Sequence, residues 1–265
     1  MPDDTYTHGH QPSVLRSHSW RTAENSAAHL LPHLRPGLRV LDVGCGPGTI
    51  TVDLAERVAP GEVLGVDRSE EVVALAAQTF AGREGVRFAT GDVYGLDLAE
   101  GSVDVVHAHQ VLQHLSDPVA ALVEMRRVCT RDGVVAARDS DYGAFTWAPA
   151  DEQLNRWLEV YRAVARSNGA EPDAGRYLKG WALRAGFSEV RASASVWCFT
   201  EPDDRAWWGG LWAERVEESD LARQAVDRGF ATREDLAGFA AAFRRWVDAP
   251  DGWFAVLHGE ILARP

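Results

Sequence analysis

The sequence has few cysteines, no long apolar run and no cluster of basic residues. Its three cysteines have neither metal-ligand spacing nor the number and spacing of a disulfide framework. No apolar run approaches the roughly 20 residues that a membrane-spanning helix requires, and residues 1–11 lack the apolar core of a signal peptide. These absences predict a cytoplasmic protein with no membrane span and no metal centre.

The charge balance argues against nucleic acid as a partner. The formal net charge is −12, and Lys and Arg do not gather in one stretch. A surface that binds phosphates needs clustered basic side chains. We therefore expect a small-molecule substrate, handled by a monomer or a homodimer.

The most informative stretch is residues 40–49, which read VLDVGCGPGT. Its apolar start predicts a buried strand, and Gly44, Gly46 and Gly48 predict a sharp turn that lets the backbone approach a ligand. The helix expected to follow would turn its free N–H groups toward that ligand. The dinucleotide fingerprint G-x-G-x-x-G does not fit, because the third glycine comes one residue early. Asp42 at the strand end suits a cationic ligand better than a pyrophosphate.

Strands and helices alternate along the first 140 residues. This alternation predicts right-handed βαβ units, a parallel sheet and helices on both of its faces. A first helix is expected from Thr22 to about residue 34, with Pro36-Gly37 as its end. The other expected strands are 63–67, 86–89, 103–108 and 134–137, the expected helices start at Ser69 and Pro118, and a charged turn is expected at 138–141.

The second half of the chain is rich in tryptophan, since nine of the ten tryptophans lie beyond residue 146. Amphipathic patterns predict helices around 154–161, 177–185 and 207–212 and after Thr232, and strands at 189–199 and 253–262. The expected organisation is an N-terminal lead-in and helix (1–36), a core (37–142), a lid insertion (143–173), a continuation of the core (174–201), a second lid insertion (202–249) and a final core strand (250–265).

Four motifs together resemble the class I S-adenosylmethionine-dependent methyltransferases. Residues 42–48 (DVGCGPG) look like the first motif of that family, and Asp67 matches the acidic residue that holds the ribose hydroxyls. Gly91-Asp92-Val93 resembles the motif whose Asp meets the adenine amino group. Residues 110–118 resemble the fourth-strand motif of the subgroup that includes the ubiquinone and menaquinone biosynthesis enzymes.

The resemblance implies a fold, a cofactor and a set of site residues. The fold would be α/β and Rossmann-like, with a seven-stranded, mostly parallel sheet, an antiparallel last strand and helical lid insertions. The cofactor would be S-adenosyl-L-methionine, with S-adenosyl-L-homocysteine as product. The predicted cofactor-binding residues are Asp42, Gly44, Cys45, Gly46, Gly48, Asp67, Arg68, Asp92, Val93 and His109, and the predicted substrate-binding residues are Tyr6, His10, Gln110 and Trp208.

His114 is the candidate catalytic base. A hydroxyl acceptor needs a group that removes its proton, and histidine titrates near neutral pH. A carboxylate acceptor would need no base. The paired acids Asp139 and Asp141 could hold a divalent cation. We favour another interpretation, in which these acids form a salt bridge with Arg138 or contact the lid or the lead-in.

The tryptophans of the insertions predict an acceptor pocket with apolar, aromatic walls. We therefore expect a mid-sized, partly hydrophobic acceptor, such as a natural-product or quinone-like ring of secondary metabolism, with O-methylation favoured over C- or N-methylation. Two alternatives remain at this point. One is an NAD-dependent oxidoreductase, and the other is a catalytically inactive cofactor-binding module of the same fold.

Overall fold

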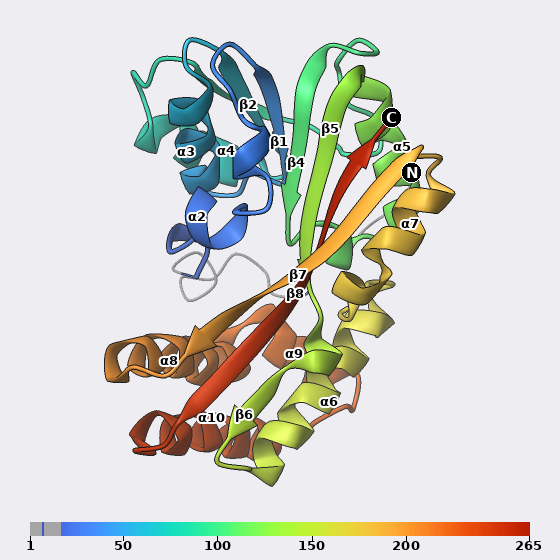
Figure 1. Cartoon of the computed structure of the whole chain (residues 1–265). Coiled ribbons are helices and arrows are strands. Elements are labelled where there is room, and N and C mark those ends of the chain that lie inside the picture. Colours follow the sequence, from blue (N-terminus) through green and yellow to red (C-terminus); the bar gives the residue numbers. More distant parts are fainter. Residues whose placement is uncertain (1–6, 8–16) are drawn as a thin grey trace.

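Within the part of the chain that the computed structural model describes, residues 7 and 17–265, eight strands form one sheet (Figure 1). The strands are β1 (Arg39–Val43), β2 (Glu62–Asp67), β3 (Val86–Thr90), β4 (Val103–His109), β5 (Cys129–Ser140), β6 (Thr146–Ala148), β7 (Glu189–Phe199) and β8 (Trp253–Arg264). Their order is β3-β2-β1-β4-β5-β8-β6, and β7 also pairs with β8. Strands β1 to β5 are parallel, whereas β8 is antiparallel to β5, β6 and β7. The predicted α/β sheet with an antiparallel last strand is confirmed, and the short β6 is an addition to it.

The central strand β1 is covered on both faces. Val40 packs with Ile50 and Leu54 of α3 (Thr49–Val58), while Leu41 and Val43 pack in a separate cluster. That second cluster also contains buried residues of α5 (Pro118–Val128) and α7 (Leu178–Arg184). Alternate strand residues face opposite layers, so the apolar run of β1 is buried from both sides.

Helix α4 (Glu70–Thr79) begins as the sequence predicts. The Ser69 hydroxyl accepts a hydrogen bond from the Val72 N–H and so caps the first turn. The helix packs against β2 and β3. It closes the βαβ unit that carries Asp67 at the end of β2.

The long helix expected from Thr22 to residue 34 is wrong. Helix α2 covers only Ala23–Ser26, and a separate 3-10 turn, η1, covers Leu31–His33. Pro32 explains the break, because proline has no N–H to donate and its ring clashes with the carbonyl four residues earlier.

The charged turn expected at 138–141 is also wrong over most of its length. Strand β5 continues to Ser140, and Arg138 lies opposite Glu260 of β8 in the register. Both side chains are buried, and Arg138 Nε is 3.3 Å from Glu260 Oε1. The ion pair across the strands lets charged residues stay inside the sheet.

Four helices form a layer at the far ends of β7 and β8 (Figure 1). They are α6 (Glu152–Ser167), α8 (Pro202–Glu218), α9 (Asp220–Asp227) and α10 (Arg233–Asp248). We call them the helical layer. Its core is rich in aromatic side chains, among them Trp157, Trp212 and Phe243. In Figure 1, the β7–β8 ribbon runs from the parallel sheet into this layer and so links the two.

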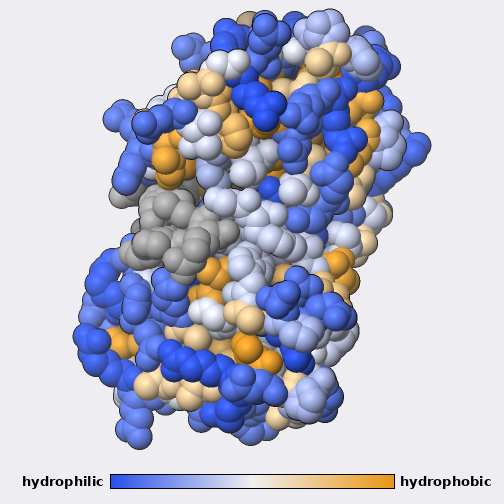
Figure 2. All heavy atoms as spheres, turned by 90° about the vertical axis from the view of Figure 1, so that its left-hand side faces the viewer, coloured by the Kyte–Doolittle hydropathy of each residue, from blue (hydrophilic) through white to orange (hydrophobic). Residues whose placement is uncertain are grey.

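The face shown in Figure 2 is mainly hydrophilic, with apolar side chains scattered over both halves. This surface agrees with the strongly acidic composition. Over the described residues, no helix combines the length and the apolar character that crossing a membrane requires.

Candidate functional site

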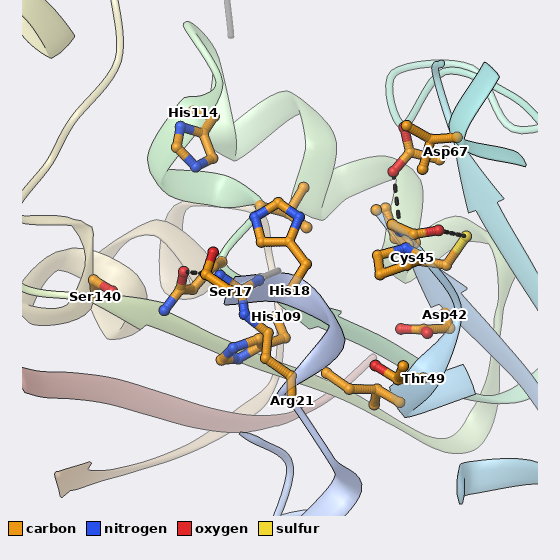
Figure 3. A pocket seen from close by; sticks show the side chains of 18 of the residues that line it. Ser17, His18, Arg21, Asp42, Cys45, Thr49, Asp67, His109, His114 and Ser140 are labelled. Atoms are coloured by element: carbon orange, nitrogen blue, oxygen red, sulfur yellow. Dashed lines mark hydrogen bonds between the residues drawn. The ribbon is translucent and has the colours of Figure 1, made fainter. Parts of the chain in front are cut away.

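One cavity lies where the glycine turn meets the β7–β8 ribbon and the helical layer. Its lining includes the turn after β1, the ends of β2 and β4, and aromatic side chains of α8. Figure 3 shows Asp67 and Cys45 on one side, His114 on the other, and His18 between them. We call the part of the cavity lined by the turn after β1 and the segments that follow β2 and β3 the glycine end, and the part lined by the aromatic side chains of β7 and α8 the aromatic end.

The glycine turn has a backbone that few other residues could adopt. Gly44 and Gly46 have φ angles of 64° and 54°, in the left-handed region. A Cβ on Gly44 would lie 2.4 Å from Val111 Cγ2, whereas the space beside Gly46 is open, with His18 Nδ1 3.9 Å away. The turn thus packs closely against Val111 at one glycine and presents bare backbone to the cavity at the next.

Asp42 lies at the base of the turn and is almost fully buried. The Thr51 hydroxyl donates to its Oδ2 at 2.6 Å, and His107 Nδ1 lies 2.7 Å from its Oδ1. Protein groups therefore engage both carboxylate oxygens. Asp42 ties the end of β1 to α3 and β4, and it also places a carboxylate in the cavity wall.

Asp67 and Asp92 bring two more carboxylates to the glycine end. Asp67 accepts hydrogen bonds from the N–H groups of Gly46 and Ser69, each at 3.1 Å. Asp92 accepts one from the Tyr94 N–H at 3.0 Å. These backbone bonds fix the orientation of both side chains while each carboxylate keeps acceptor capacity for a ligand.

The other predicted cofactor residues fall into two groups. Cys45, Arg68, Val93 and His109 line the cavity. Gly48 is not among the lining residues. Its φ of 85° and the ring of Phe88, 2.6 Å from where a Cβ would lie, show a role in starting α3 against β3.

His109 lies at the end of β4 and is 5% exposed. Neither ring nitrogen has a hydrogen-bond partner among the described residues, and the ring sits 5.6 Å from that of Trp197. Burial lowers the pKa of His109 well below its usual value, and the nearby Arg21 lowers it further. His109 is therefore neutral.

His114 ends the short 3-10 turn η2 (Leu112–His114) and lines the cavity. Its Nε2 lies 3.0 Å from Gln113 Nε2. Burial, reinforced by the charge of Arg21, lowers the pKa of His114 to about 3. The imidazole therefore stays neutral over the working pH range, and it is a weak base.

Gln110 and Trp208, two of the predicted substrate residues, also line the cavity. Gln110 has a φ of 54°, and its Oε1 accepts a hydrogen bond from Arg21 Nη2 at 2.7 Å. Trp208 stacks on Phe199 with ring centres 4.5 Å apart. The predicted residues Tyr6 and His10 lie outside the described residues.

The acids considered for a metal have other partners. Asp141 makes a two-pronged ion pair with Arg176, and Asp139 accepts a hydrogen bond from the Gln113 N–H. Burial raises the pKa of Asp139 to about 7. Across residues 7 and 17–265, no group of three or more His, Cys, Asp or Glu residues could hold a metal ion. The ion-pair partner of Asp141 is Arg176, not Arg138.

Several cavity residues were not foreseen from the sequence. Arg21 and Arg215 both line the cavity, although they lie far apart in the chain. Tyr142 also lines it and stacks on Tyr161 with ring centres 4.0 Å apart. The only sequence signal for Tyr142 was its place just after the fifth strand, where open α/β sheets bind ligands.

Comparison with known proteins shows the family. A family model described as a methyltransferase domain matches residues 34–186. The chain is 34% identical to an uncharacterized methyltransferase of Schizosaccharomyces pombe, over 97% of this chain and 95% of that protein. It is 35% identical to a demethylmenaquinone methyltransferase of Staphylococcus aureus, over 40% of this chain and 45% of that protein.

A solved structure shows the same fold. It is phosphoethanolamine N-methyltransferase 2 of Haemonchus contortus, in complex with phosphomonomethylethanolamine and S-adenosylhomocysteine. The TM-score is 0.58 at 18% identity, and the match covers 91% of this chain and 53% of that one. The glycine turn, the strand-end acids and the methyltransferase matches agree: the chain belongs to the class I S-adenosylmethionine-dependent methyltransferases.

Proposed function

We propose that the protein methylates an oxygen of a mid-sized, partly hydrophobic small molecule, such as a natural-product or quinone-like ring. One observation carries the proposal: a single cavity joins three strand-end carboxylates to a wall of aromatic rings. S-Adenosylmethionine, the cofactor of the family, supplies an electrophilic methyl group on a good leaving group. The protein must then align the acceptor and exclude water.

The residues at the glycine end fit this cofactor. Gly46 leaves bare backbone at the cavity wall, and Asp67 can accept hydrogen bonds from two neighbouring ribose hydroxyls. Asp92 can accept one from an exocyclic amino group. Cys45 is a passive part of this wall, because burial raises the pKa of its thiol and keeps it protonated.

The aromatic end suits the acceptor. Its walls include Tyr142, Phe145, Trp197, Trp207, Trp208 and Trp212. Rings of this kind bind flat, apolar groups by burial and stacking. We further propose that residues 143–173 and 202–249, which contain α6 and α8 to α10, serve as insertions that cover the cofactor-binding core.

We propose that His114 acts in its neutral form. Its Nε2 accepts a hydrogen bond from the Gln113 amide, 3.0 Å away. An acceptor hydroxyl would replace that amide as the donor, be oriented by the same lone pair and give its proton to it as the oxygen is methylated. The low pKa of about 3 makes His114 a weak base but leaves its nitrogen unprotonated at neutral pH. An acidic hydroxyl, such as a phenol on an electron-poor ring, suits such a base best.

Incubation with methyl-labelled S-adenosylmethionine and a panel of phenols, quinols and aliphatic alcohols tests this function. We expect label in a phenolic or quinol product and equimolar S-adenosylhomocysteine. Trp208→Leu should reduce acceptor affinity, while Trp253→Leu, an exposed change outside the cavity lining, should not. Cofactor binding without transfer to any compound would favour a binding module. Saturable binding of NAD instead of S-adenosylmethionine would favour an oxidoreductase.

A further inference from the structure

Two arginines from distant parts of the chain meet at the cavity. Arg21 lies just before α2, and Arg215 lies on α8. Arg215 Nη2 donates a hydrogen bond to Ser17 Oγ at 2.9 Å, across 198 positions of sequence. Because Ser17 and Arg21 belong to the same short segment and both line the cavity, this bond brings α8 next to the segment that carries Arg21.

Both guanidinium groups are held in place by rings and polar contacts. The guanidinium carbon of Arg215 lies 4.7 Å from the ring centre of Trp212, and that of Arg21 lies 5.9 Å from the ring centre of Trp197. Arg21 also donates to Gln110 Oε1. These contacts orient two guanidinium groups, and the planar arrangement of N–H donors on each group fits the two oxygens of a carboxylate.

The acidic residues of the cavity lining gather at one of its ends. Among the described lining residues, the carboxylates are those of Asp42, Asp67 and Asp92, and all three belong to the glycine end, where Arg68 follows Asp67. Arg21 and Arg215 stand with the aromatic rings. The aromatic end therefore carries two arginines and none of the described lining carboxylates, in a chain whose net charge is −12.

The pKa shifts around the aromatic end agree with this polarity. Burial lowers the pKa of both His109 and His114, and the charge of Arg21 adds to each shift. Burial raises the pKa of Tyr142, while the charges of Arg215 and Arg21 both oppose that rise. The charges of both arginines thus lower the pKa of the same side chain, that of Tyr142, which lines the cavity.

We propose that Arg21 and Arg215 bind a carboxylate carried by the methyl acceptor. The aromatic rings would hold the flat, apolar body of the acceptor, and the guanidinium groups would anchor its acid and set its orientation. Charge-assisted bonds between Arg and a carboxylate are strong and directional. The acceptor class is then an aromatic or polycyclic carboxylic acid. This inference rests on the proposed methyltransferase function, because it assigns the acceptor of that reaction.

The test compares acids with their neutral amides. Benzoate, benzamide, 2-naphthoate and 2-naphthamide are titrated into the full chain by calorimetry, with S-adenosylhomocysteine at saturation. We expect at least one acid to bind ten or more times as tightly as its amide, which corresponds to about 1.4 kcal/mol. Arg21→Gln and Arg215→Gln should each reduce this preference at least threefold. Arg244→Gln removes the same charge from an exposed site on α10, paired with Glu217, and should leave the preference unchanged.

Three results would overturn the inference: no binding of either acid, equal binding of acids and amides, or a preference that survives in both arginine variants. If Arg215→Gln does not fold, as judged by its melting curve, Arg21→Gln decides. Titration of S-adenosylmethionine into the same proteins, prepared without S-adenosylhomocysteine, separates the two claims. Loss of that binding in the wild type would count against the proposed function. Normal cofactor binding without acid preference would count against the arginine assignment alone.

Discussion

Replacing Gly44 by alanine tests whether the glycine turn is built by close packing against the fourth-strand loop. Gly44 has a φ of 64°, and a Cβ there would lie 2.4 Å from Val111 Cγ2. A left-handed conformation costs a residue with a Cβ about 1–2 kcal/mol, and overpacking costs about 1–3 kcal/mol more. We therefore expect Gly44→Ala to lower the free energy of unfolding by roughly 2–5 kcal/mol.

Gly46→Ala is the matched control for this change. Gly46 has a similar φ of 54°, but the space beside it is open. It should show the backbone cost alone, about 1–2 kcal/mol. In the double variant Gly44→Ala/Val111→Ala the obstructing methyl group is gone, so the two changes should be less costly together than their sum.

Urea unfolding followed by tryptophan fluorescence measures these differences. Gly44→Ala should also weaken cofactor binding, because Val111 itself lines the cavity. A loss of stability in Gly44→Ala no larger than that in Gly46→Ala would refute the packing argument. Strict additivity in the double variant would refute it too.

Two further predictions concern histidines. His29, His109 and His258 have pKa values lowered by burial, His29 to about 4, so the unfolded chain binds protons that the native state does not. The free energy of unfolding should therefore fall as the pH drops from 6.5 to 5, by up to about 1.4 kcal/mol per pH unit for each histidine. Urea titrations at constant m-value that show no such fall would contradict the lowered pKa values of these three histidines. His114→Ala should slow turnover more than it changes cofactor affinity. In the wild type, the turnover rate should show no decline near pH 6.5 that is due to protonation of His114. A variant that turns over at the wild-type rate would remove His114 from the mechanism.

The sheet and the glycine end could be predicted from the sequence because their signals are local. A buried parallel strand is a continuous apolar run, such as residues 63–66, and the glycine turn is seven consecutive residues. The spacing to Asp67 and Asp92 follows from the βαβ repeat. Helix starts with a capping side chain or an initial proline, such as Ser69 and Pro118, were also found correctly.

Features that depend on distant contacts could not be predicted in this way. Charged residues 138–141 read as a turn, but the partner that keeps Arg138 inside β5 is Glu260 on the last strand. Arg215 reaches the cavity through a bond that spans 198 positions. The difference at residues 22–34 is of another kind, since the apolar spacing there is helical but Pro32 interrupts it, a signal that is local to the sequence.

The central claim is that the glycine end binds S-adenosylmethionine, and calorimetric titration of that compound tests it most directly. The wild type should bind one equivalent, and Asp67→Ala should bind more than tenfold more weakly, since it loses charge-assisted bonds to the ribose hydroxyls. Asp227→Ala, an exposed change on α9, should bind as the wild type does. Unchanged affinity in Asp67→Ala, or no binding to the wild type, would contradict the account.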